Sequence, residues 1–233
     1  IAARWGFTVH PFNVNEAATL LTEGKVIGRS VGQSEYGPRS LGNRSILADP
    51  RNPNMMDYIN REIKQREGFR PFAPSILAES VTEYFEQNFE TPFMVVASQV
   101  KKNKRKIIPS VTHIDGSARV QTVRKEQNPG YYQLLKAFEK VSGVPVLLNT
   151  SFNDNEEPIV ETPEDALRSF LATGLDYLIL ENWLIKRPEN SLAIEGELSK
   201  SITNSKKEEY QSLIKRFCDL NRYNAVNLSL LKT

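Results

Sequence analysis

The sequence predicts an α/β fold in which helices flank a sheet. Segments rich in β-branched and other apolar residues alternate with segments whose apolar residues recur every three or four positions, which is typical of α/β domains. The 233 residues, 39% of them hydrophobic and 25% charged, can bury one sizeable core. Apolar content falls from Pro188 onward. We therefore expect one domain at residues 1–188, and a linker with a C-terminal helical tail at residues 189–233.

The first elements lead into a long loop. Asn15 is a candidate N-cap for a short helix through EAATLLTE, which Gly24 ends, and KVIGRSV then predicts a buried strand. The next segment, residues 32–51, has glycines at positions 32, 37 and 42 and no regular apolar period, so we expect it to be a loop throughout.

Two helix starts follow. Asn52 and Pro53 predict the start of a helix that Gly68 ends, with an apolar stripe of Met55 or Met56, Ile59 and Ile63. Ser80 and Glu83 form a capping-box pattern for VTEYFEQN. FMVVASQV then predicts a strand, KKNKRK a hairpin-like tip, and RVQTV a further strand.

The remaining elements have clear boundaries. NPGYYQLLKAFEKVSG predicts a helix with a stripe of Leu134, Leu135, Phe138 and Val141, which Gly143 joins to the buried strand VPVLL. Thr162, Pro163 and Asp165 open a helix over ALRSFLAT, and DYLILENWLIKR predicts a strand. In the tail, YQSLIKRFCDL predicts an amphipathic helix.

Composition narrows the classes of function. The 30 Lys and Arg nearly balance the 28 Asp and Glu, so net charge favours neither a nucleic-acid-wrapping protein nor a membrane-surface protein. A single cysteine, Cys218, excludes an internal disulfide framework and fits a cytoplasmic protein. No apolar run approaches the roughly 18 residues of a membrane span. Because the chain begins with Ile1, we expect an N-terminal portion that is not included.

Basic residues concentrate in the loop at residues 32–51. Arg39, Arg44 and Arg51 carry planar forks that suit phosphate oxygens, and the glycines expose backbone N–H groups, so the loop favours anion binding. The alternative is a surface loop whose arginines pair with carboxylates such as Glu35 and Asp49. The loop alone leaves both interpretations open.

Two further clusters support a polar ligand site. Lys64, Arg66 and Arg70 lie within KQREGFRPFAP, where we expect Phe69 and Phe72 to flank and position the Arg70 guanidinium. Amide and hydroxyl groups follow the VPVLL strand, at the strand end where open α/β sheets bind ligands; they belong to Asn149, Thr150, Ser151 and Asn153.

The remaining motifs, and the motifs that are missing, mainly exclude classes of site. His113, beside Asp115 and ahead of Arg119, is more often a structural histidine than a catalytic one. With His10 as the other histidine and no metal-binding motif, we expect no protein-built metal site. The chain has no P-loop, no dinucleotide fingerprint and no nucleophile elbow. The KKNKRK run is more typical of a solvated loop tip than of an RNA contact, so we expect no nucleic-acid partner.

At these residues the chain resembles the C-terminal domain of the carbamoyltransferase family that includes nodulation and antibiotic O-carbamoyltransferases. The resemblance spans about residues 24–187 through EYGPRSLGNRSILADPR, KQREGFRPFAPSIL, HIDGSARVQTV and VPVLLNTSFNDNEEPIV, followed by TPEDALRSFLATGLDYL. That domain is similar to the YrdC-like twisted open sheet of threonylcarbamoyl-adenylate synthases. Their K-x-R motif is matched by Lys64 with Arg66, and their S-x-N motif by Ser151 with Asn153.

The resemblance implies that carbamoyl phosphate and ATP, accompanied by Mg²⁺, form carbamoyl-adenylate in this domain. An N-terminal domain of the same protein would then transfer the carbamoyl group to a hydroxyl acceptor. Positioning and charge neutralisation suffice for such chemistry. The resemblance implies phosphate binding by Lys64, Arg66 and Arg39, and further substrate contacts from Asn43, Arg44, Arg70, His113, Arg119, Asn149, Ser151 and Asn153.

Two departures from the family pattern keep rival functions open. Gln33 stands where the family has a basic residue, and Glu156 where it has a glycine. The first rival is a nucleotide- or RNA-binding module with the same groove and weakened catalysis. The second is a structural partner whose groove docks the N-terminal domain, with a contact from the tail helix around Leu213, Ile214 and Phe217.

Overall fold

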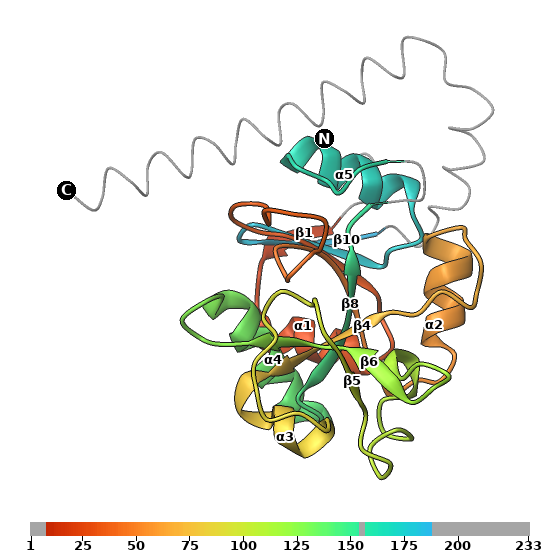
Figure 1. Cartoon of the computed structure of the whole chain (residues 1–233). Helices are drawn as coiled ribbons and strands as arrows, with labels where there is room; N and C mark the ends of the chain where they lie inside the picture. The colour runs from red at the N-terminus through yellow and green to blue at the C-terminus, as the bar shows by residue number, and fades with distance from the viewer. Residues whose placement is uncertain (1–7, 154–156, 188–233) are drawn as a thin grey trace, which may run out of the picture.

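The computed structural model describes residues 8–153 and 157–187, which form a mixed sheet with flanking helices (Figure 1). The eight strands of this sheet run in the order β1-β10-β9-β2-β3-β8-β4-β7. Their bounds are β1 Thr8–Pro11, β2 Ile27–Ser30, β3 Arg44–Ala48, β4 Ala73–Leu77, β7 Gln121–Val123, β8 Val146–Ser151, β9 Tyr177–Leu180 and β10 Trp183–Lys186. β2 pairs in parallel with β9, and β4 with β7, whereas the other neighbours are antiparallel. The predicted α/β class is confirmed.

Smaller elements complete the architecture. An antiparallel pair consists of β5 Ala97–Gln99 and β6 Ser117–Arg119. The helices are α1 Val14–Thr22, α2 Met55–Tyr58, the π-helical η2 Ile59–Ile63, α3 Val81–Tyr84, α4 Pro129–Ser142 and α5 Pro163–Ala172, with 3₁₀ turns at Ala78–Ser80 and Pro109–Val111. Helices α1 and α4 pack together and α4 also contacts β4 and β8, whereas α5 contacts β2 and β9.

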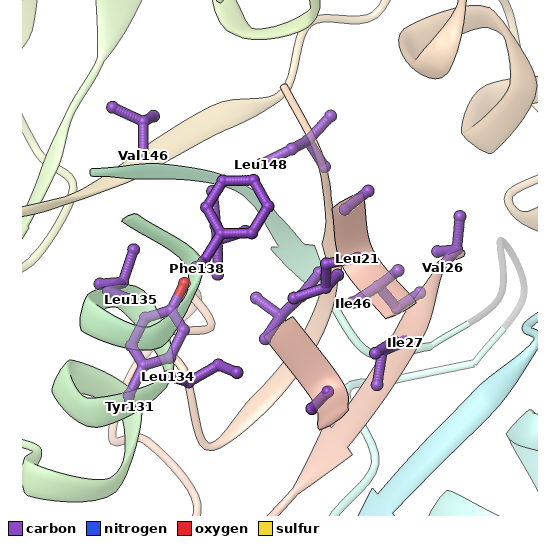
Figure 2. Packing of buried hydrophobic residues seen from close by; sticks show 14 of the residues in the cluster. Leu21, Val26, Ile27, Ile46, Tyr131, Leu134, Leu135, Phe138, Val146 and Leu148 are labelled. Carbon is purple, nitrogen blue, oxygen red and sulfur yellow. The ribbon is translucent and has the colours of Figure 1, made fainter. Parts of the chain in front are cut away.

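The hydrophobic core lies between α1, α4 and the sheet. Figure 2 shows Phe138 and Leu134 of α4 near Leu148 of β8, Ile46 of β3 and Leu21 of α1, all of them fully buried. Burying each such side chain contributes about 1.5–3 kcal/mol. This layer fixes the central strands from which the candidate site is built.

Two longer predicted helices are confirmed, and both begin at a capping side chain. In α4, Asn128 accepts a hydrogen bond from the Tyr131 N–H, and Gly143 ends the helix at a φ of 74°. In α5, Thr162 and Asp165 form a reciprocal capping box. Val141 was wrongly assigned to the buried stripe, since it lies in the last turn of α4 and is 52% exposed.

Other helix boundaries differ from the predictions. Asn13, not Asn15, caps α1, because its Oδ1 accepts the N–H groups of Asn15 (2.9 Å) and Glu16 (3.2 Å). The helix after Pro53 changes to π-helical turns and ends at Ile63, well before Gly68.

The capping box predicted at the start of VTEYFEQN does not form. Ser80 makes no side-chain cap bond, so the prediction was wrong, and α3 is only four residues long.

The loop prediction for residues 32–51 was wrong at its centre. Residues Arg44–Ala48 form β3, a fully buried strand between β2 and β8. Arg44 and Ser45 at its start obscured the short apolar run that follows. β4, which begins with Ala73 and Pro74 and is also buried, was not predicted.

Three strand predictions had the wrong extent. DYLILENWLIKR forms the two strands β9 and β10, because the chain reverses at Glu181, whose φ is 50°. RVQTV is divided between β6 and β7, and FMVVASQV contributes only β5. The VPVLL strand continues as β8 to Ser151, so Asn149 and Thr150 lie within a strand and not after one.

Some predictions fall outside the described residues. These are the linker and tail helix at residues 189–233, with Cys218, and the departure at Glu156. None of the helices within the described ranges is long and apolar enough to cross a membrane.

Candidate functional site

Lys64 connects the two motifs that the sequence predicted to converge. It follows η2 directly and is 3% exposed. Its Nζ donates to the Ser151 carbonyl (2.6 Å), the Asn153 carbonyl (2.7 Å) and Asn153 Oδ1 (2.9 Å). The Ser151 hydroxyl also donates to Asn153 Oδ1 (2.7 Å). An ammonium group, a hydroxyl and an amide therefore meet at the carboxyl end of β8.

Arg66, two residues after Lys64, is held by contacts of its own. Its Nε donates to Asn60 Oδ1 (2.7 Å), and its guanidinium lies 5.0 Å from the centroid of the Phe72 ring. Burial lowers the pKa of Arg66, and the positive charge of Arg70 lowers it further. Asn60, which the sequence analysis missed, fixes the Arg66 side chain in place.

The aromatic contact predicted for Arg70 belongs to Arg66. Arg70 instead pairs with Glu67 (3.0 Å) and its side chain is 49% exposed. Phe69 is 74% exposed, so it does not enclose a guanidinium. The prediction that both rings flank Arg70 was therefore wrong, because Phe72 turns into the core while Phe69 faces outward.

A second group of cations surrounds Arg119. Within residues 8–153 and 157–187, the Arg119 side chain makes no hydrogen bond or ion pair, and its Nε is buried without a partner. Burial and the charge of Arg39 lower the pKa of Arg119. Arg39 is exposed and likewise has no carboxylate partner in the described ranges. The charges of these two arginines thus interact, and neither has a carboxylate partner among the described residues.

His113 lies close enough to Arg119 for the charge of that arginine to affect its pKa. Burial lowers the pKa of His113 and the charge of Arg119 adds to the effect, while Asp115 opposes it. The ring Nδ1 is 3.2 Å from Ser117 Oγ, and Ser117 Oγ is 2.7 Å from Asp115 Oδ1. Asp115 therefore contacts the serine and not the imidazole, so the three residues do not form a nucleophilic triad.

Arg44 has a different role from the one expected. It is 5% exposed. Its N–H groups make five hydrogen bonds to backbone carbonyls, with acceptors at Val31, Gly32, Asn43 and, twice, Glu161. Since a guanidinium has five N–H donors, none remains for a phosphate in this conformation. The Arg44 side chain therefore holds the surrounding backbone segments together.

Asn43 is similarly engaged within the protein. Its amide donates to the Gln33 carbonyl (2.9 Å), and its Oδ1 accepts from Arg29 (3.2 Å) and Asn128 (2.8 Å). The expected substrate contact from Asn43 therefore becomes a contact that shapes the loop.

Asn149 lies beneath the loop and not at a ligand surface. It is 1% exposed, and its Nδ2 donates to the Ser40 carbonyl (3.2 Å), Ser75 Oγ (3.0 Å) and Gln121 Oε1 (2.9 Å). Gln121 and Ser75 were not singled out from the sequence. Gln121 lies in β7 and Ser75 in β4. Their proximity to Asn149 follows from the pairing of these strands and could not be predicted before the strands were known.

The arginines of the loop do not all follow the same interpretation. Arg51 pairs with Asp49 (2.5 Å), as the surface-loop interpretation expected. Glu35 binds backbone N–H groups and no arginine. In the basic run, Lys101 donates to the Thr82 carbonyl and Lys104 pairs with Glu83, so these two cations are engaged within the protein. In the ranges that the structure describes, no three His, Cys, Asp or Glu side chains gather to hold a metal ion.

Comparison with known proteins identifies the family of this chain. The family model for the carbamoyltransferase C-terminus matches residues 18–187. Nodulation protein NolNO of Sinorhizobium fredii is 51% identical over 176 residues, which cover 74% of this chain and 26% of that protein. The 3'-hydroxymethylcephem-O-carbamoyltransferase of Amycolatopsis lactamdurans is 39% identical over 187 residues, covering 80% of this chain and 35% of that protein. The chain thus spans about a quarter to a third of their length.

The fold has a solved counterpart. The structure of P. abyssi Sua5 complexed with L-threonine superposes with a TM-score of 0.50 at 14% identity, covering 72% of this chain and 46% of that one. This likeness concerns the fold alone, and the expected YrdC-like fold is confirmed. By its sequence match over residues 18–187, the chain belongs to the carbamoyltransferase C-terminus family.

Proposed function

We propose that this domain forms carbamoyl-adenylate from carbamoyl phosphate and ATP. Water would first cleave carbamoyl phosphate into carbamate and inorganic phosphate. A carbamate oxygen would then attack the α-phosphorus of ATP, and the bond from that phosphorus to the bridging oxygen would break and release pyrophosphate. Both substrates and both leaving groups are anions, so the reaction depends chiefly on positioned positive charge.

The unpaired cations around Arg119 carry the proposal. A buried guanidinium nitrogen without an acceptor is costly, because it has lost its water and gained no hydrogen bond. In Arg119 the nitrogen is Nε, and the positive charge of Arg39 adds repulsion by lowering the pKa of Arg119 further. A phosphate would remove both costs at once, since its oxygens accept from guanidinium forks. Arg66 and Arg70 extend the positive charge around Phe72.

Lys64, Ser151 and Asn153 would handle the smaller reacting groups. Their polar atoms form one hydrogen-bonded unit at the end of β8. The hydroxyl of Ser151 and the amide of Asn153 could exchange these internal bonds for bonds to carbamoyl or adenylate oxygens. The ammonium of Lys64 would supply charge where negative charge develops. His113 would remain neutral near pH 7 and contribute a hydrogen bond and not a charge.

ATP would be a co-substrate, and Mg²⁺ would arrive bound mainly to its phosphates. We further propose a separate N-terminal domain of the same protein as the site of carbamoyl transfer to a hydroxyl acceptor, and a cytoplasmic location. The relatives, three to four times longer than their matched regions, support the first of these proposals.

Exchange of labelled pyrophosphate into ATP tests the proposal, because it reports reversible adenylate formation. We expect exchange that depends on carbamoyl phosphate and is lost in Lys64→Ala and Ser151→Ala. Lys136→Ala, on the exposed face of α4, is the matched control. Exchange that needs no carbamoyl phosphate, or that survives in both variants, would contradict the proposed function.

A further inference from the structure

Side chains from three strands hold residues 40–42, the segment that follows Arg39. Successive carbonyls of Ser40, Leu41 and Gly42 each accept a hydrogen bond from a different buried side chain. The donors are Asn149 of β8, Gln121 of β7 (2.7 Å to the Leu41 carbonyl) and Arg29 of β2. Because these donors lie far apart in the sequence, the segment is fixed by the sheet and not by local turn chemistry.

From the other side, the same segment is held by Glu35. Its Oε1 accepts the backbone N–H groups of Leu41 (2.7 Å), Asn43 (2.6 Å) and Arg44 (3.3 Å). Backbone N–H groups that converge on one point form an anion-binding nest. Here a carboxylate of this chain already fills the nest, and Gly42 N–H, which lies between them, donates to Ser45 Oγ (3.0 Å).

The negative charge of Glu35 interacts with a buried cation, the guanidinium of Arg29. Desolvation lowers the pKa of Arg29 to about 10, and the charge of Glu35 opposes that shift. The two side chains contact opposite polar groups of one peptide segment, the carbonyl of Gly42 and the N–H of Asn43. Charge-assisted bonds on both sides give the segment a single conformation.

We propose that Glu35 is a positioning residue whose carboxylate fills the backbone nest at residues 41–44 and thereby fixes the loop that presents Arg39. The importance of Arg39 rests on the proposed function, whereas the filled nest does not. One consequence concerns the substrates: since the nest is occupied, the loop contributes the Arg39 side chain to an anionic ligand and not its backbone N–H groups.

A residue that only stabilises the fold and a residue that positions Arg39 predict different effects on anion affinity. If Glu35 only stabilised the fold, its loss would lower stability and leave the affinity of the folded protein for an anion unchanged. If it positions Arg39, the effects of Glu35→Ala and Arg39→Ala on pyrophosphate affinity will not add, because the first already removes what the second contributes.

The first measurement is backbone hydrogen exchange in the full chain without substrates. In Glu35→Ala we expect exchange at Leu41 and Asn43 to accelerate at least about tenfold, the size of one charge-assisted hydrogen bond. Sodium acetate, which supplies a free carboxylate, should restore protection. Glu35→Gln keeps the shape of the side chain and loses its charge, so its exchange rates at these residues should lie between those of the native chain and of Glu35→Ala. Glu139→Gln on α4 is the control. Unchanged exchange in Glu35→Ala would overturn the inference.

The second measurement is pyrophosphate binding by calorimetry to the native chain, both single variants and the double variant. We expect Glu35→Ala to weaken binding about as much as Arg39→Ala, with acetate restoring affinity only where Arg39 is present. Additive effects, or native affinity in Glu35→Ala, would overturn the positioning role. If the native chain binds no pyrophosphate while the exchange result holds, the proposed function fails and the filled nest stands.

Discussion

Lys64 Nζ lies 2.9 Å from Asn153 Oδ1, although 89 residues separate the two in the chain. The π-helical end of η2 delivers one and the end of β8 the other, so neither could be placed from its own local sequence. Their contact joins the helix that carries the basic cluster to the strand that carries the amides. It is the structural basis for assigning both clusters to one site.

Replacing Lys64 by Met should cost both stability and function. The partly buried oxygens of Ser151 and Asn153 would lose their cationic donor, and an acceptor left unsatisfied away from water costs about 1–3 kcal/mol. We expect the free energy of unfolding in urea to fall by that amount. Lys136→Met should change it by less than about 0.5 kcal/mol, because its partners are exposed. Equal effects in the two variants would show that Lys64 is not an organising contact.

Arg119→Met should separate function from stability. Among the described residues Arg119 has no hydrogen-bond or ion-pair partner to lose, and replacing its buried, unpaired Nε by an apolar atom removes a desolvation cost. We expect unchanged or higher stability and at least tenfold weaker pyrophosphate binding. Arg124→Met, which removes an exposed arginine paired with Glu90, is the control and should leave binding intact. A marked loss of stability in Arg119→Met would instead indicate a structural role.

Gly42→Ala should disrupt the loop. Gly42 has a φ of 118°, and an added Cβ would lie 2.3 Å from Cδ1 of the buried Tyr131 ring. Strain and overlap together should cost roughly 2–4 kcal/mol. Gly143→Ala is the comparison: its φ is 74° and nothing lies within 4 Å of the added Cβ, so only about 1 kcal/mol is expected. Thermal unfolding of both variants checks the difference, and equal losses would contradict the tight packing at Gly42.

His113 should make stability depend on pH. Burial lowers its pKa in the folded protein below the ordinary value of 6.5. Between that lowered pKa and 6.5 the unfolded chain binds more protons, so the contribution of His113 is complete above pH 6.5 and is lost as the pH falls through this window. His113→Gln should flatten the slope there. Proton NMR of the two histidines would contradict this account if His113 titrated at or above 6.5.

The sequence predicted the elements whose signals are local. The start of α5 at Thr162 and three of the four stripe residues of α4, Leu134, Leu135 and Phe138, depend on residues three or four apart, and they were placed correctly. β3 was missed because its first two residues are polar, although Arg44 is buried among carbonyls that come from distant loops. A polar residue in a buried strand has no local signature.

The candidate site was predicted in the same uneven way. The convergence of Lys64 with Ser151 followed from the resemblance of their motifs, and the structure brings them together. The roles of Asn149 and Asn43 in holding the loop could not be predicted, since they depend on contacts with Ser40 and Gln33 across the fold. Neither could the nest around Glu35, which exists only once the loop has its final conformation.

Detection of the intermediate tests the central claim most directly. The full chain would be incubated with ATP, Mg²⁺ and ¹³C-labelled carbamoyl phosphate, and the products followed by ¹³C NMR and mass spectrometry, with Arg119→Met in parallel. The account predicts labelled carbamoyl-adenylate together with equal amounts of phosphate and pyrophosphate, and its loss in the variant. ATP binding by the native chain with no labelled adenylate, both in the chain alone and with the proposed N-terminal domain joined to it, would contradict it.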